Sequence, residues 1–192
     1  MRIEGPTGVV YRLSRRFVPT ASQTASVLWA FRNASTLTAQ LLQAKLQLLQ
    51  VGAPTAALED RFSLTVGRTY SAGDTTGGVA ISPTSGKQDL TSGSGNVAQV
   101  TVHESNVAGG LTGGTKVLDS DPIARGSVWV PAAVPTATVQ SPSLIFDYRP
   151  DAAGEIALLL PTNRGFVIAC DNALGTASGV ILQLDLMWTE RP

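Results

Sequence analysis

Hydrophobic and polar positions alternate most regularly near the C-terminus of the chain. Over residues 180–189, every second residue is large and apolar, namely Val180, Leu182, Leu184, Leu186 and Trp188. Because successive side chains of a strand point to opposite faces, this pattern predicts a strand with one apolar face. Such a face must be covered by a second layer, most simply another sheet.

A shorter apolar run, residues 165–171, precedes this strand. The segment between the two runs contains the turn-forming residues Asn172, Gly175, Ser178 and Gly179. The two runs are therefore predicted to form a C-terminal hairpin.

Further short apolar or alternating runs are separated by stretches rich in glycine, serine, threonine and proline. These candidate strands are residues 26–32, 61–68, 79–81, 97–103, 117–118, 127–130, 143–148 and 156–160. About eight to ten short strands with little helix indicate a sandwich or a barrel. We predict an all-β fold, an antiparallel β-sandwich of jelly-roll-like form with long Gly/Thr/Ser-rich loops.

Residues 38–51 fit two patterns. Leu41, Leu42, Lys45, Leu46 and Leu49 have helical spacing, and the segment is rich in good helix formers. The alternation of Leu42, Ala44, Leu46 and Leu48 with polar residues instead predicts a strand. We favour the strand, and the helix remains an alternative.

Residues 1–24 form either an N-terminal arm or an edge strand, and residues 25–192 are predicted to be a single β-sandwich domain. The first residues are not followed by an apolar core, so we expect no signal peptide. No run of eighteen apolar residues is present, so we expect no membrane-spanning segment and no membrane partner.

Charge is sparse in this chain. Charged residues make up 15% of the 192 residues, against roughly 25% in an ordinary domain, and Lys+Arg and Asp+Glu both number 14. A chain without a basic excess is not expected to bind nucleic acid. Low charge and zero net charge instead favour association with protein partners, including copies of the chain itself.

The arm and two glycine-rich loops, residues 70–96 and 105–116, are the candidate contact regions for such partners. Loops of this length within a compact domain are usually functional or disordered. The candidate partner-contact residues are Arg12, Arg15, Arg16, Tyr70, Lys87 and Lys116.

We identify no catalytic, cofactor or metal residues. Cys170 lies in an apolar strand pattern, and the single histidine, His103, is distant in sequence, so a buried structural thiol is favoured over a nucleophile. Residues 109–116 resemble a phosphate-binding loop superficially, but the Gly-Lys-Ser/Thr order is missing. A calcium site at Asp119 and Asp121, with Asp89, lacks the spacing of an EF-hand loop.

The six tyrosines and tryptophans have two interpretations. Tyr11, Tyr70, Tyr148, Trp29, Trp129 and Trp188 could form a sugar-stacking platform. Because most of them lie within alternating strands, core positions are favoured.

The layout from residue 25 to residue 190 resembles that of small virion proteins of tailed bacteriophages. The similar segments are residues 27–33, 42–51, 64–68, 164–166 and 184–190. The resemblance implies a non-enzymatic jelly-roll protein that decorates, or cements, a phage capsid as a homotrimer. Its partners would be the major capsid protein or other virion proteins, and its location would be the virion, after assembly in the host cytoplasm.

A different class of function is a binding module of a tail fibre or baseplate that recognises host-surface glycans. Exposure of Trp129 or Tyr148 in an open groove would favour this alternative.

Overall fold

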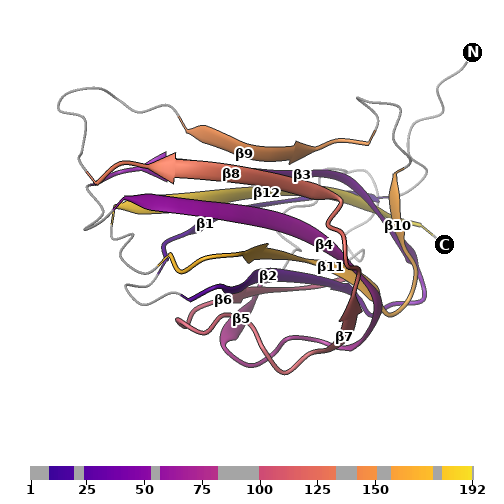
Figure 1. Ribbon diagram of the computed structural model, residues 1–192. Coiled ribbons are helices and arrows are strands. Elements are labelled where there is room, and N and C mark those ends of the chain that lie inside the picture. The colour runs from indigo at the N-terminus through magenta and orange to yellow at the C-terminus, as the bar shows by residue number, and fades with distance from the viewer. Residues whose placement is uncertain are drawn as a thin grey trace, which may run out of the picture.

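The chain folds into two antiparallel sheets packed face to face (Figure 1). The computed structural model describes residues 9–19, 24–52, 57–81, 100–132, 142–150, 157–174 and 179–191. These residues form twelve strands and no helix, so none of them forms a helix that could cross a membrane. The predicted β-sandwich is confirmed.

The smaller sheet has five strands. Its order is β1 (Val9–Phe17), β12 (Val180–Arg191), β3 (Thr38–Gln50) and β10 (Leu158–Leu160), and β9 (Ser143–Tyr148) also pairs with β3. The first strand, β1, therefore lies at one edge of this sheet. Of the two alternatives for the N-terminal region, the edge strand applies to residues 9–17.

The larger sheet has seven strands. Its order is β5 (Gly78–Ile81), β6 (Val100–Ser105), β2 (Ser26–Asn33), β11 (Arg164–Cys170), β4 (Leu58–Ala72) and β7 (Thr115–Leu118), and β8 (Ala124–Val130) also pairs with β4. The long strand β4 pairs with β8 along its first half and with β7 along its second half.

Early strands pair with late strands in a nested way. β1 pairs with β12, β2 with β11 and β3 with β10, and these pairs alternate between the two sheets. Two further pairings, β12 with β3 and β11 with β4, join the nested pairs within each sheet. This is the jelly-roll arrangement, to which the β5–β6 pair adds an extension beside β2.

The predicted C-terminal hairpin is wrong. β11 and β12 are both strands, but β11 pairs with β2 and β4 in the larger sheet, whereas β12 pairs with β1 and β3 in the smaller sheet. The chain between them crosses from one sheet to the other. In this arrangement, apolar residues of β11 and β12 meet in one core cluster between the two sheets.

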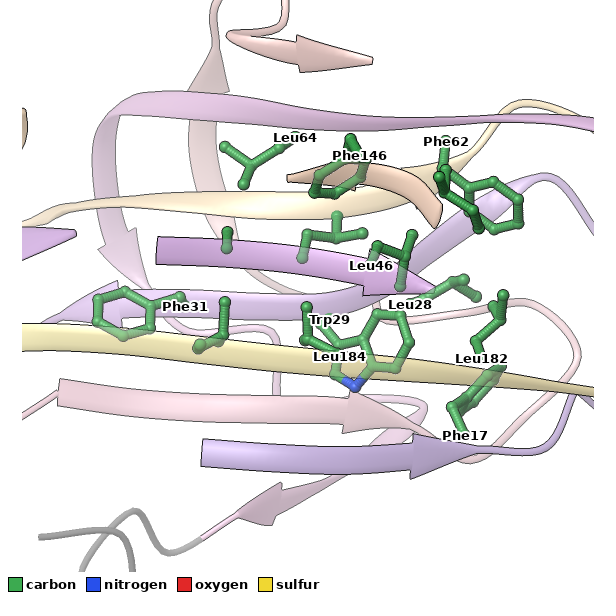
Figure 2. Packing of buried hydrophobic residues seen from close by; sticks show 14 of the residues in the cluster. Phe17, Leu28, Trp29, Phe31, Leu46, Phe62, Leu64, Phe146, Leu182 and Leu184 are labelled. Atoms are coloured by element: carbon green, nitrogen blue, oxygen red, sulfur yellow. The ribbon is translucent and has the colours of Figure 1, made fainter. Parts of the chain in front are cut away.

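The space between the sheets is filled by the alternating apolar residues (Figure 2). All five residues of the predicted apolar face of β12, from Val180 to Trp188, are buried. They meet Phe31, Phe62 and Leu64 from the larger sheet in the same cluster. Burial of such side chains contributes about 1.5–3 kcal/mol each relative to exposure, so this layer favours the packing of the two sheets.

Residues 38–50 form a strand, as favoured, but with one change of face. Opposite β12, Met187 pairs with Gln43 and Trp188 with Leu41, so Leu42 is an extra residue in a β-bulge. As a result Leu41 is fully buried, and Leu42 does not share the inward face of Ala44 and Leu46.

Candidate binding surface

A polar hollow of about 460 Å³ lies where the start of β4 meets the end of β11. Among the described residues it is lined by Glu59, Arg61, Asp171 and Asn172. A second hollow of about 330 Å³ shares Arg61 and is lined also by Arg125, Gly126 and Ser127 of β8. The two hollows together follow the outer face of the larger sheet across β4 and β8.

Strand alternation positions these side chains. In β4, Leu58, Asp60 and Phe62 point inward and are buried, so Glu59 and Arg61 point outward and are exposed. The β4–β8 register places Trp129 opposite Glu59 and Ser127 opposite Arg61. Directly opposite residues of an antiparallel pair have neighbouring side chains on one face, so Trp129 neighbours Glu59, one of the residues that line the polar hollow.

The buried carboxylate of Asp60 fastens the end of β11 to β4. Its Oδ1 accepts hydrogen bonds from the backbone N–H groups of Arg61 at 2.6 Å and Asn172 at 2.9 Å. The Asn172 side chain donates to the Glu59 carbonyl at 3.1 Å, and the Asp171 N–H donates to the Arg61 carbonyl at 2.9 Å. These four bonds fix the backbone that carries the two acidic residues of the hollow, Glu59 and Asp171.

Burial raises the pKa of Asp60 from 3.8 to about 6, and the negative charge of Asp171 adds to the rise. The hydrogen bonds from Asn172 and Arg61 oppose it. The second carboxylate oxygen, Oδ2, is buried and has no hydrogen-bond partner within the described residues. Protonation of this oxygen removes the cost of a buried charge, which explains the direction of the shift.

Trp129 is the exposed member of the six aromatic residues considered above, with 63% of its surface accessible. The other five are buried at 7% exposure or less, as expected for core positions. Tyr148 therefore does not line a surface groove. A platform built from all six residues is excluded, and Trp129 alone is available to a ligand.

The predicted contact residues of the arm fall into two groups. Arg12 and Arg16 are exposed on β1, where Arg12 forms a loose ion pair with Asp185 at 3.8 Å. Arg15 points toward the core side and donates to both carboxylate oxygens of Glu104 on β6, at 2.8 and 3.2 Å. Arg15 is therefore engaged within the chain, and Arg12 and Arg16 remain on the surface.

Tyr70 is wrongly predicted as a contact residue. It lies within β4 and is fully buried, and its hydroxyl donates to Asp74, which is also fully buried. Burial is the main cause that raises the pKa of this hydroxyl. The sequence pattern did not predict the burial of Tyr70, because the glycine-rich sequence that follows it suggested that the strand had already ended.

Lys116 has a largely internal role as well. Its ammonium group pairs with Asp74 at 2.5 Å, and its side chain is only 14% exposed. Asp74 also accepts a hydrogen bond from the Gly114 N–H at 3.1 Å. Lys87 lies outside the described residues, as do residues 82–96 of the first predicted loop.

The second loop lies against the outer face of the larger sheet. Leu111 is buried against Ala30, Tyr70 and Val167 in a small second core. The Leu111 N–H donates to the Val27 carbonyl at 2.9 Å, and Thr112 and Thr76 exchange two backbone hydrogen bonds. The resemblance of residues 109–116 to a phosphate loop thus reflects a covering loop that is bonded to its sheet.

The structure also places the remaining candidates for chemistry. The Cys170 thiol is buried and bonded toward the Ser26 carbonyl, and burial raises its pKa to about 11. Burial lowers the pKa of His103. Asp119 pairs with Arg68, while Asp89 lies outside the described residues, and no group of metal-binding side chains occurs in the part of the chain that is described.

No family model, no curated protein and no solved structure matches this chain. Its function must therefore be argued from its own residues.

The residues of the polar hollow were missed by the sequence reasoning. Glu59 and Arg61 alternate with buried residues, and this pattern is typical of any solvated face of a strand. Asp171 was interpreted as the last residue of an apolar strand run, and Asn172 as a turn residue of a hairpin. No sequence signal brings the two segments together, because their proximity depends on the pairing of β11 with β4.

Proposed function

We propose that the chain is a non-enzymatic virion structural protein, a capsid decoration protein that stabilises a phage head through contacts between subunits. The proposal is supported by the jelly-roll arrangement and by the low content of charged residues. The fold alone does not choose between functions, since jelly rolls serve many. The main support comes from one feature of the protein surface.

That feature is the apolar edge of the larger sheet at β7. Val117 is 62% exposed, Leu118 is 37% exposed and Ile123, in the turn toward β8, is 39% exposed. Within the described residues β7 pairs with β4 along one side only, so its other side presents unpaired backbone groups. Exposed apolar edge strands promote association, and monomeric proteins usually protect them.

A neighbouring subunit that covers this edge would bury the three side chains and pair the free backbone groups. Each such contact is weak, but many identical contacts on a shell act together. A closed ring satisfies every copy of a head-to-tail contact, so the expected homotrimer is one natural closure. Among the described residues, the exposed Arg12 and Arg16 on β1 are the remaining candidates for contact with the capsid.

Analytical ultracentrifugation of the purified chain tests the role of the edge. We expect an oligomer for the wild type, and a monomer for the Val117→Asp, Leu118→Asp double variant. Leu159→Asp, which charges a 54% exposed leucine on β10, is the matched control and should leave the oligomer intact. A monomeric wild type, or an oligomer that survives the double variant, would overturn the assignment of the edge.

A second candidate function is a binding module of a tail fibre or baseplate that recognises host glycans. The exposure of Trp129 beside the polar hollow favours it. Gold-labelled antibody against this chain on intact particles separates the two functions. Label on the head supports decoration, and label confined to the tail supports the receptor-binding module.

A further inference from the structure

We propose that the polar hollow binds a neutral saccharide, with Trp129 as the stacking surface for one sugar ring. This site is independent of the decoration role, because it uses β4, β8 and the end of β11 and not the β7 edge. It deepens the second candidate function by naming the residues and the class of ligand.

The size and the polarity of the hollow favour a hydroxylated ligand. Its volume of about 460 Å³ falls within the roughly 300–1,000 Å³ typical of small-molecule sites. Its four described lining residues are all polar, which disfavours an apolar ligand. Carboxylates, guanidinium groups and amide oxygens together can accept from and donate to the vicinal hydroxyl groups of a sugar.

Among the described residues, the charged ends of the side chains around the two hollows form no ion pairs. No ion pair within the described part of the chain involves Glu59, Arg61, Arg125 or Asp171. The Asn172 amide group donates to the Glu59 carbonyl, which leaves its own oxygen as an acceptor. Hydrogen bonds fix the backbone that carries Glu59, Asp171 and Asn172, which reduces the conformational freedom lost when a ligand binds.

The charges of the surface favour a neutral ligand. Two carboxylates, those of Glu59 and Asp171, and the Arg61 guanidinium line the polar hollow, and the Arg125 guanidinium lines the adjoining one. An acidic sugar or a nucleic-acid phosphate would meet Arg61 but would also meet both carboxylates. Repulsion from these two carboxylates disfavours an anionic ligand.

Trp129 supplies the apolar contact that sugar recognition needs. A pyranose ring has one face of C–H groups, which packs on an aromatic ring, while its hydroxyl groups point toward polar partners. Trp129 stands opposite Glu59 on the outer face, so a ring stacked on the indole lies next to the polar hollow. Because 63% of the Trp129 surface is accessible, this side chain contributes little to packing among the described residues.

Tryptophan fluorescence tests the site directly, because Trp29 and Trp188 are buried and Trp129 is the exposed residue of the three. The full chain is first applied to an array of neutral and acidic oligosaccharides. The best neutral oligosaccharide of the array is then titrated while quenching by acrylamide is recorded. We expect the bound saccharide to protect Trp129 from acrylamide.

Single-residue variants test which side chains bind the saccharide. Asp171→Asn and Arg61→Met should each weaken binding about tenfold, which corresponds to the loss of one well-placed polar contact. Trp129→Ala should abolish detectable binding, and for this variant binding is measured by the array signal. Leu144→Ala, an exposed apolar truncation on β9 of the other sheet, is the matched control and should bind as the wild type does.

Three results would overturn the proposal. They are binding of acidic oligosaccharides alone, absence of binding to every array member, and wild-type binding by Trp129→Ala. The Val117→Asp, Leu118→Asp variant keeps the whole hollow and should retain saccharide binding. Its behaviour separates failure of this site from failure of the assembly role.

Discussion

An ion pair between Arg15 and Glu104 joins the two sheets at β1, the edge strand of the smaller sheet. Arg15 lies on β1 of the smaller sheet and donates from Nε and Nη2 to both carboxylate oxygens of Glu104, which lies on β6 of the larger sheet. The indole N–H of Trp29 donates to the same carboxylate at 2.8 Å. Arg15, which was predicted to contact a partner, is therefore part of a hydrogen-bonded group with Glu104 and Trp29. We call this group the clasp.

We expect Glu104→Ala to lower the free energy of unfolding by about 2–4 kcal/mol, because it leaves the Trp29 N–H and the Arg15 guanidinium without their acceptor. Glu104→Gln keeps one acceptor for Trp29 and should lose less. Urea unfolding followed by the fluorescence of the buried tryptophans measures both changes. The control is Arg12→Met, which breaks an exposed pair of 3.8 Å and should change stability by about 0.5 kcal/mol or less. Equal losses for Glu104→Ala and Arg12→Met would contradict the clasp.

The buried Asp60 should make stability depend on pH. Its pKa of about 6 in the folded state exceeds the ordinary value of 3.8, so the folded chain retains a proton that the unfolded chain has released. The contribution of Asp60 is complete below about pH 4 and is lost as the pH rises through about 6. Asp60→Asn keeps an oxygen acceptor for the Arg61 and Asn172 N–H groups and removes the charge.

The stability of Asp60→Asn relative to the wild type should therefore increase by about 2–3 kcal/mol between pH 4 and pH 8. Thermal unfolding across this range measures the difference. Asp121→Asn makes the same charge change at an exposed turn and serves as the control. A difference between Asp60→Asn and wild type that does not vary with pH would show that Asp60 titrates as it does in the unfolded chain.

Two adjacent glycines give a matched test of the loop that covers the larger sheet. Gly110 has a φ of +71°, and a Cβ there would lie 2.7 Å from the Ser26 hydroxyl oxygen and 2.8 Å from the Val27 carbonyl oxygen. Gly110→Ala should cost about 2 kcal/mol or more, from the left-handed backbone and the close contact. Gly109→Ala meets nothing within 4 Å and should be close to neutral.

Hydrogen exchange at the Leu111 amide reports this loop specifically, because that N–H bonds to the Val27 carbonyl. Gly110→Ala should accelerate the exchange and Gly109→Ala should not. Equal exchange in both variants would mean that the loop does not depend on the conformation of Gly110.

Cys170 should be inert in the folded chain. It is 3% exposed, and burial raises the pKa of its thiol to about 11, so little thiolate forms near pH 8. A thiol reagent such as dithionitrobenzoate should label it slowly in buffer and completely in concentrated guanidinium chloride. Rapid labelling of the native chain would contradict the buried position.

The strands and their inward faces could be predicted from sequence because alternation has a direct physical cause. In β12, the period of two places five apolar side chains on one face. All five are buried, namely Val180, Leu182, Leu184, Leu186 and Trp188. The same argument favoured a strand over a helix for residues 38–51. It failed locally at Leu42, because a bulge shifts the alternation by one residue and its position depends on the partner strand.

Alternation contains no information about which strand pairs with which. β11 and β12 are neighbours in sequence with turn residues between them, yet they lie in different sheets. The polar hollow follows from this pairing, since Asp171 reaches Arg61 only because β11 lies beside β4. Burial of Tyr70 likewise depends on a loop, residues 106–114, that folds back over the sheet.

The sequence by itself thus determined the class of fold and the face that each strand buries, because both depend on short-range spacing and the hydrophobic effect. Only the tertiary structure decided the strand order, the clasp of Arg15 with Glu104 and the group of side chains around Arg61. These depend on contacts between residues far apart in the chain, and many arrangements of equally amphipathic strands would bury the same apolar faces.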